Sequence, residues 1–350
     1  MFPHKKNIIN PYHIFISVVL SLIPAAGMAQ QIPRSSQYIM NEFIVNPAVA
    51  GVDGMTTLNI SGRKEWIGFS EDVPTPETYS ASFQTRFLKK SSEVKNGIFG
   101  KRLVKASKGR VGMGISLIND YNGALQRTGI NATYAYHIFL REAQLSFGLT
   151  ASIAQMKIRS KYLNFKDNDE PLLNLANSSY WIPDFGAGIN YMQQNFHIGF
   201  SASQLLESKF VFGNSGINTG DPDIHYKRNY NLISSYKHDL AAGSSWEYEP
   251  SVLIKMYDPV QFQPTFSGPM LQADMMLRII YQKGLWFGLA YRTSQEFVAL
   301  LGVKVQKLYI SYSFDYGTNS LSSLSYGSHE ISISLKLGDS TRRLPWTGRY

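Results

Sequence analysis

Strict alternation of apolar and polar residues near the C-terminus most constrains what this chain can fold into. It is clearest in two segments, 306–317 and 327–338. Their apolar positions are Leu308, Ile310, Tyr312, Phe314, Tyr316, Ile331, Ile333, Leu335 and Leu337. Side chains of a strand point alternately to opposite sides, so each segment predicts a strand with one apolar face and one polar face. The pattern recurs along most of the chain, which predicts an all-β fold.

Alternation and turn residues together predict about fourteen strands. They lie near residues 55–65, 78–88, 110–119, 128–140, 143–158, 183–193, 195–204, 226–238, 246–258, 270–282, 284–293, 296–305, 306–317 and 327–338. Short connections such as 193–195 largely alternate with longer ones such as 120–127 and 159–182. Bacterial outer-membrane barrels show this alternation, with short periplasmic turns and longer outer loops. We therefore predict a transmembrane antiparallel up-and-down β-barrel over residues 55–338, with both of its ends in the periplasm.

A soluble β-sandwich is the alternative, because its strands also alternate. Three features favour the barrel. The polar faces are rich in small residues, and the strands approach the ten or so residues that a tilted membrane-spanning strand needs. Aromatic residues stand at strand ends, as interface girdles do in barrels. These girdle candidates are Tyr79 with Phe87, Tyr281 with Trp286, and Tyr309 with Tyr316.

The N-terminus has the features of a secretory signal. Lys5 and Lys6 precede an apolar stretch from Ile14 to Ala26, and small residues lead up to a cleavage site after Ala29. We expect residues 1–29 to be removed and the protein to reach the outer membrane. Residues 30–54 then form an irregular N-terminal segment, periplasmic or lumenal, and 339–350 a C-terminal tail. The chain has no cysteine, which excludes thiol catalysis and thiolate metal sites.

Two stretches carry a more specific pattern. Residues 36–51 read SQYIMNEFIVNPAVAG, and residues 63–69 read RKEWIGF, followed by Pro74, Thr75 and Thr78. In this order they resemble the opening signature of the PorP/SprF family of the type IX secretion system of Bacteroidetes. Val49 stands where the family usually has an aromatic residue and Glu65 where it has glutamine. Asn119-Asp120 with Gly123 is similar to the next family element.

The resemblance implies a non-enzymatic outer-membrane protein. Such a protein would anchor or assist the surface display of a secreted protein that carries a type IX C-terminal sorting domain, as gliding adhesins do. It would also, or instead, dock the periplasmic machinery. On this basis we predict partner-binding residues in the two signatures: Gln37, Tyr38, Asn46, Pro47, Gly51, Arg63, Trp66, Gly68 and Phe69.

Each signature also has a plainer interpretation. Asn46-Pro47 predicts a rigid turn before the first strand, because proline fixes φ and keeps the preceding residue extended. The functional alternative is a partner contact or a plug seated in the lumen. Trp66 and Phe69 either anchor the barrel at the membrane interface or present an aromatic anchor to a partner.

Other chemistry receives little support from the sequence. We interpret Arg63, Arg86, Asp274, Arg278 and Lys336 as a charge network inside the barrel. The acidic segment 167–170 lacks the spacing of a calcium loop, and the histidines lack metal-ligand spacing. We predict no cofactor, no metal, no enzymatic activity and no nucleic-acid partner; lipid surrounds the barrel. The alternative function is a passive outer-membrane channel or a transporter of hydrophobic solutes.

Overall fold

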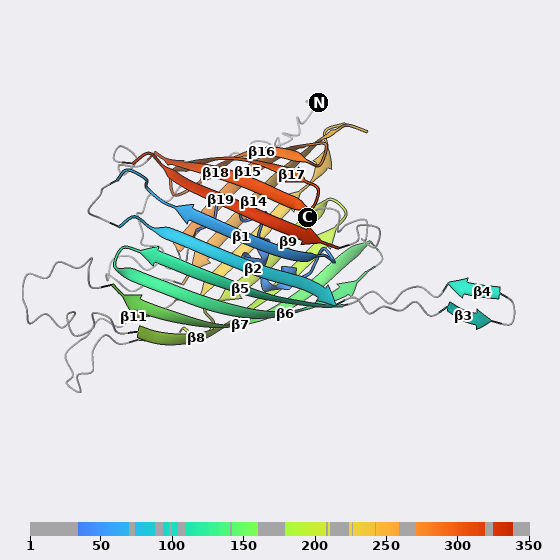
Figure 1. Ribbon diagram of the computed structural model, residues 1–350, viewed down its shortest axis with the longest axis horizontal. Coiled ribbons are helices and arrows are strands. Elements are labelled where there is room, and N and C mark those ends of the chain that lie inside the picture. Colours follow the sequence, from blue (N-terminus) through green and yellow to red (C-terminus); the bar gives the residue numbers. More distant parts are fainter. Residues whose placement is uncertain are drawn as a thin grey trace, which may run out of the picture.

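In the computed structural model the chain forms a closed antiparallel β-barrel (Figure 1). Fourteen strands make up its wall in the described part of the chain. They are β1 (Thr56–Lys64), β2 (Glu77–Phe87), β5 (Val111–Asn122), β6 (Leu125–Phe139), β7 (Ala143–Ile158), β8 (Ser179–Gln193), β9 (Phe196–Ser203), β12 (Asn229–Tyr236), β14 (Trp246–Tyr257), β15 (Met270–Tyr281), β16 (Leu285–Arg292), β17 (Glu296–Val305), β18 (Leu308–Gly317) and β19 (Ser328–Leu337). β1 pairs with β19 and β12 with β14, which closes the ring. The predicted all-β barrel of about fourteen strands is confirmed.

The structure describes residues 34–69, 74–87, 94–97, 100–103, 110–140, 142–159, 179–207, 209–210, 224–225, 227–241, 243–258, 270–318 and 325–338. The predicted signal peptide, the C-terminal tail and the acidic segment 167–170 lie outside these residues. In the described part of the chain, no helix is long and apolar enough to cross a membrane.

The two faces of the wall differ as the alternation predicts. In β19, Ile331 and Ile333 are 54% and 43% exposed on the outside, whereas Glu330 and Ser332 are each 2% exposed on the inside. Large apolar side chains are exposed in the same way on the other strands of the wall, and an apolar outer surface that runs around the barrel is suited to lipid. The girdle assignments of Trp286 and Tyr309 are wrong, because both side chains point into the lumen, where Trp286 is 5% exposed and its ring lies 6.2 Å from that of Tyr309. On the outside, Tyr281 stacks instead against Trp246, with ring centroids 4.5 Å apart.

The barrel has two distinct ends. At the terminal end β1 begins, β19 ends, and tight turns such as 194–195 and 306–307 connect strands. The short hairpin of β3 (Val94–Gly97) and β4 (Gly100–Leu103) extends from this end (Figure 1). At the opposite loop end lie the connections from β7 to β8 and from β9 to β12; the latter contains β10 (Lys209–Phe210) and β11 (Ile224–His225). A two-residue strand, β13 (His238–Asp239), extends the sheet beside β14.

One predicted loop-end connection is wrong. The sequence predicted a long connection over 120–127, but β5 continues to Asn122 and β6 begins at Leu125. Only Gly123 and Ala124 separate the two strands, and Gly123 has a φ of 58°. Polar residues such as Asn119 and Asp120 resembled a loop in sequence, yet they are ladder residues paired with Thr128 and Arg127.

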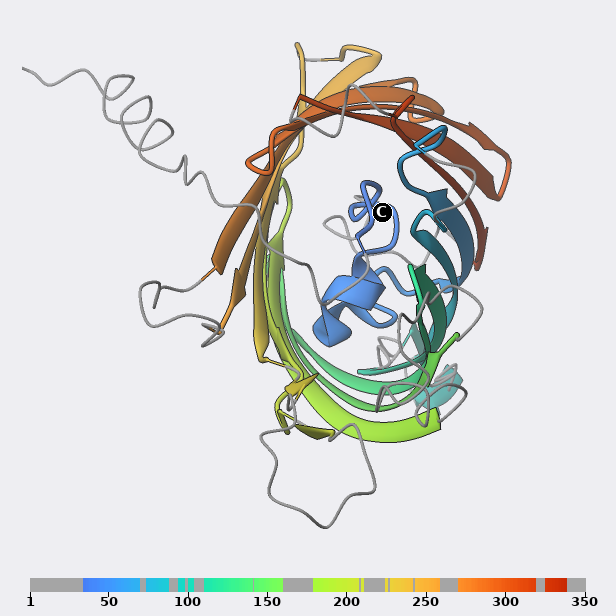
Figure 2. The same cartoon turned by 90° about the vertical axis from the view of Figure 1, so that its left-hand side faces the viewer.

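Residues 34–55, which we call the plug, lie inside the ring of strands (Figure 2). The plug contains a one-turn helix, α2 (Glu42–Val45), and a 3₁₀ turn, η1 (Pro47–Val49). Arg34 binds Glu296, the first residue of β17 and therefore at the loop end. From there the plug descends through the lumen and joins β1 at the terminal end.

Candidate functional site: a plugged lumen and its polar chamber

The first residues of the plug are held by charged groups of the wall near the loop end. Ser36 donates a hydrogen bond of 2.5 Å from its hydroxyl to Asp315 and one of 2.8 Å from its backbone N–H to Glu330. Arg63 bonds the same Ser36 hydroxyl at 3.0 Å. The plug therefore hydrogen-bonds to side chains on three strands, β1, β18 and β19.

Two arginines pair with the carboxylates of this buried cluster. Arg63 contacts Asp315 at 2.8 Å, Glu65 at 2.8 Å and Glu330 at 3.4 Å. Arg292 contacts Asp274, Glu296 and Asp315 at 3.1, 2.6 and 3.4 Å. Buried charges are tolerated only when they are paired and hydrogen-bonded, and each carboxylate named here touches at least one guanidinium. Arg278 and Glu249 form a further pair deeper in the lumen.

Gln37 and Tyr38 attach the next part of the plug. The Gln37 amide donates to the backbone carbonyl of Glu330 at 3.1 Å and accepts a bond from Ser311. Tyr38 is 2% exposed, and its hydroxyl lies 3.2 Å from that of Ser251 on β14. Burial raises the pKa of the Tyr38 phenol above its ordinary value, so it stays protonated and can donate this bond.

Asn46 and Pro47 form a close contact between plug and wall. Asn46 caps η1, since its side-chain oxygen accepts from the Ala48 N–H at 3.0 Å, while its amide donates to the Ile189 carbonyl at 3.1 Å. The wall beneath is made of glycines. A Cβ atom on Gly148 would lie 2.3 Å from the Ala48 nitrogen, and one on Gly188 would lie 2.1 Å from the Asn46 side-chain oxygen.

Together with Gly112, Gly114 and Gly199, these residues form what we call the glycine bed, on β5, β7, β8 and β9. At each of the five, an added Cβ would come within 2.7 Å of a plug atom. The backbone and side chains of the plug can approach the wall this closely only where the wall has no side chains.

The end of the plug is fixed near the terminal end. Gly51 has a φ of 66°, and its N–H donates to Gln84 at 3.0 Å. Arg86 donates to the carbonyls of Gly51 and Val52. His137, which is fully buried, bonds the Ala50 carbonyl at 3.0 Å. These bonds satisfy carbonyls that an irregular buried segment would otherwise leave unpaired.

The second signature lies elsewhere, on the rim of the loop end. Trp66 has a φ of 51°, and its backbone N–H donates a hydrogen bond to the Ser328 hydroxyl at 3.3 Å. The centroid of its ring lies 6.4 Å from that of Phe69. Gly68, with a φ of 82°, faces Tyr326, which is 77% exposed. Two backbone bonds, from Ile67 to Gly327 and from Tyr326 to Ile67, join this turn to the last connection of the barrel.

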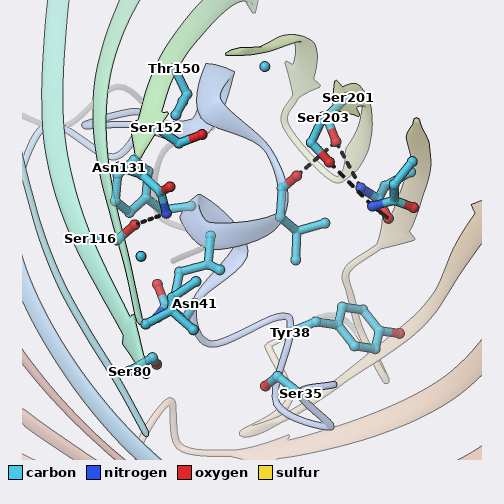
Figure 3. Close-up of a pocket in the computed structure, with 18 of the residues that line it drawn as sticks. Ser35, Tyr38, Asn41, Ser80, Ser116, Asn131, Thr150, Ser152, Ser201 and Ser203 are labelled. Carbon is cyan, nitrogen blue, oxygen red and sulfur yellow. Dashed lines mark hydrogen bonds between the residues drawn. The ribbon is translucent and has the colours of Figure 1, made fainter. Parts of the chain in front are cut away.

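Between the plug and the wall lies a cavity of about 220 Å³, which we call the loop-end chamber. Figure 3 shows short polar side chains projecting into it from the plug and from several strands. They include Ser35, Asn41, Ser80, Ser116, Asn131, Thr150, Ser152, Ser201 and Ser203. Several already bond one another, for example Asn131 to Ser116 at 2.9 Å. Hydroxyl and amide groups both donate and accept. Apolar side chains such as Phe43 and Val45 and charged ones such as Arg127 also line the chamber, so it suits a segment that combines polar and apolar groups.

The nine predicted site residues thus fall into separate places. Gln37, Tyr38, Asn46, Pro47 and Gly51 are buried contacts of the plug, and Arg63 is the wall residue that holds its start. Trp66, Gly68 and Phe69 form the rim. The predicted lumenal charges Arg63, Arg86, Asp274, Arg278 and Lys336 are all buried inside the barrel. Arg63, Asp274 and Arg278 form ion pairs there, whereas Arg86 bonds backbone carbonyls of the plug.

Sequence reasoning missed the wall partners of the plug. Asp315 and Arg292 each appear as one polar residue in an alternating strand, and the glycine bed appears as scattered glycines. Glycines at alternate, inward positions, such as Gly112 with Gly114, were the available signal.

A protein-family model matches most of the chain. Residues 27–335 match a family model described as "Type IX secretion system membrane protein PorP/SprF". No curated protein matches the chain. Among solved structures, Omp33 of Acinetobacter baumannii is 9% identical, with a TM-score of 0.39 over 82% of this chain and 100% of that one. The CymD monoaromatic hydrocarbon channel is 11% identical, with a TM-score of 0.45 over 92% and 97% of the two chains.

Proposed function

The chain belongs to the PorP/SprF family of type IX secretion system membrane proteins, and we propose that it is a plugged outer-membrane barrel that holds a cognate secreted protein at the cell surface. The family consists of secretion-system membrane components rather than enzymes. In this proposal the cargo carries a type IX C-terminal sorting domain, the loop end faces outward, and the terminal end faces the periplasmic machinery.

The fixed plug is the observation that carries the proposal. An open channel needs a continuous aqueous path through the barrel. Here residues of the plug occupy the lumen from Glu296 near the loop end to Arg86 near the terminal end, with hydrogen bonds along their length. A barrel that is closed in this way is better suited to holding a partner than to conducting solutes.

The loop end offers the surface for such a partner. The loop-end chamber presents donors and acceptors that could pair with the backbone of an entering polypeptide. Trp66 and Phe69, both half-buried, stand on the rim of the loop end, and tryptophan often supplies a large share of binding energy at interfaces. We propose that Trp66 is a partner-facing anchor rather than a membrane-interface residue.

Genetic deletion tests the proposal. A strain that lacks this protein should lose surface display of one cognate protein, while its uptake of small solutes stays unchanged. Complementation with the wild-type chain should restore display. Normal display in the deletion strain would contradict the proposal.

A conductance measurement distinguishes the passive-channel alternative from the proposed function. Purified protein inserted into a planar lipid bilayer should remain closed, because the plug occupies the lumen and is hydrogen-bonded to the wall along its length. A stable open pore of the wild-type protein would favour passive transport instead.

A further inference from the structure

The wall of the loop-end chamber contains two hydrogen-bond donors that no described residue uses. Lys255 and Tyr257 both line the chamber, and Tyr257 is the last residue of β14, at the loop end. The Lys255 side chain is 12% exposed and Tyr257 is 8% exposed. Neither the Lys255 ammonium nor the Tyr257 hydroxyl forms a hydrogen bond with a described residue, and each keeps accessible surface. An ammonium group donates only, so a ligand that uses Lys255 must bring an acceptor oxygen.

Each cation in the lining of the chamber already has an acid beside it. The pairs are Arg34 with Glu296, Arg63 with Asp315 and Glu330, Arg127 with Asp120 across the register of β5 and β6, and Lys255 with Asp274. Lys255 lies 3.9 Å from Asp274, which balances its charge but is too far for a hydrogen bond. A charged ligand would lose its hydration in the lumen and meet no unmatched opposite charge. The unused donors therefore favour a neutral acceptor, such as the carbonyl group of a polypeptide.

The chamber has an apolar floor beneath these donors. Leu253 precedes Lys255 on the inward face of β14, one step further from the loop end, and it belongs to one apolar cluster with Tyr38 of the plug. Figure 3 shows Tyr38 at one side of the chamber. Val45 of the plug packs against the same cluster, is half-buried and lines the chamber. Because burial of apolar surface is favourable, this floor selects an apolar side chain.

We propose that the loop-end chamber holds an uncharged stretch of polypeptide with an apolar side chain at its tip. The side chain at the tip rests on Val45 and Leu253, and the backbone carbonyls beside it accept from Lys255 and Tyr257. The hydroxyl and amide groups of the remaining wall pair with the other backbone groups of the stretch. Only the assignment of this polypeptide to the secreted partner rests on the proposed function; the chemistry of the site does not.

Calorimetric titration of the purified protein in detergent tests this chemistry. The probes are acetyl-alanyl-leucyl-alaninamide, its seryl analogue, and acetyl-alanyl-leucyl-alanine, which ends in a free carboxylate. The neutral leucyl peptide should bind about tenfold more tightly than either of the others, because only it covers the apolar floor without adding a charge. Equal binding of the leucyl and seryl peptides would overturn the proposal, as would tighter binding of the free acid or no binding of the neutral leucyl peptide.

Variants locate the binding. Tyr257→Phe removes only the hydroxyl that faces the chamber and should weaken the leucyl peptide about threefold to tenfold, the effect of one lost hydrogen bond. Tyr248→Phe makes the same change at an outward position of the same strand and should leave the affinity unchanged. Val45→Thr keeps the shape of the side chain and should reduce the preference for leucine over serine. Unchanged affinity in Tyr257→Phe, with the barrel folded as judged by heat-modifiable migration in gels, would reject the site.

The same measurements separate this site from the proposed function. If the three peptides bind alike while the deletion strain loses surface display, the proposed function stands and the chamber is not its polypeptide site. If the leucyl peptide binds as expected while display in the deletion strain stays normal, the chamber is a polypeptide site but the proposed function fails.

Discussion

The side-chain oxygen of Asn46 lies 2.1 Å from the point that a Cβ atom on Gly188 would occupy. The plug and the wall are therefore fitted to each other at the level of single atoms. A residue of the first signature and a glycine of β8, far apart in sequence, form one packing unit. This relationship makes the seating of the plug testable by the smallest possible change, the addition of one methyl group.

Gly188→Ala should loosen the plug. Overpacking of a filled interior typically costs about 1–3 kcal/mol, and here the methyl group would collide with Asn46. We expect a lower unfolding temperature and faster proteolysis within residues 34–55. Gly129→Ala is the matched control, because its Cβ would meet Ala154 only at 3.7 Å. Equal behaviour of the two variants would contradict the fit between plug and wall.

Arg63→Met should destabilise the barrel strongly. The change leaves Asp315 and Glu330 buried without one of their cations, and breaking a buried pair in this way costs about 3–5 kcal/mol. Lys64→Met, next in sequence, breaks a pair with Glu77 in which the lysine side chain is 51% exposed, and such pairs contribute about 0–1 kcal/mol. Urea unfolding in lipid vesicles measures both. A small effect at Arg63 would mean that the cluster does not hold the start of the plug.

Deletion of residues 36–51 should open the barrel. These residues fill the lumen, whereas the wall closes through its own strand pairs. Purified wild-type protein should be silent in a planar bilayer, and the deletion variant should conduct ions. If the folded deletion variant is also silent, the wall or its loops rather than the plug would close the lumen.

The orientation of the barrel can be tested with single cysteines, because the chain contains none. Tyr326→Cys lies at the loop end and is well exposed, whereas Lys307→Cys lies in a turn at the terminal end. A membrane-impermeant maleimide applied to intact cells should label the first and not the second. Permeabilised cells should show labelling of both. The reverse pattern in intact cells would invert the proposed orientation.

Trp66→Ala should reduce surface display of the cognate protein without unfolding the barrel. Its ring lies on the rim, where it can contact a partner, and loss of a central aromatic anchor commonly costs 2 kcal/mol or more, roughly 30-fold in affinity. Trp181→Ala is the control, because Trp181 is 62% exposed on an outward position of β8. Display that falls equally in both variants would favour membrane anchoring over a partner contact.

The sequence by itself determined the strands of the barrel and their faces. Alternation is a local property, since each strand needs one apolar side for lipid and one polar side for the lumen. It can therefore be recognised in a strand without knowing which strands pair with it. The two signatures, 36–51 and 63–69, are local as well, because each is a continuous run of residues, and they could therefore be recognised as family features. The exceptions were local patterns with two meanings: polar ladder residues in 120–127 taken for a loop, and Trp286 and Tyr309 taken for interface residues.

Only the tertiary structure decided what fills the lumen. Arg63 meets Asp315 and Glu330 because closure of the ring brings β1 beside β19 and β18, more than 250 residues later in the chain. The glycine bed exists because the registers of β5, β7, β8 and β9 align their glycines at one height. Contacts across a barrel depend on strand order, register and closure, and a linear pattern of polar and apolar residues contains none of these.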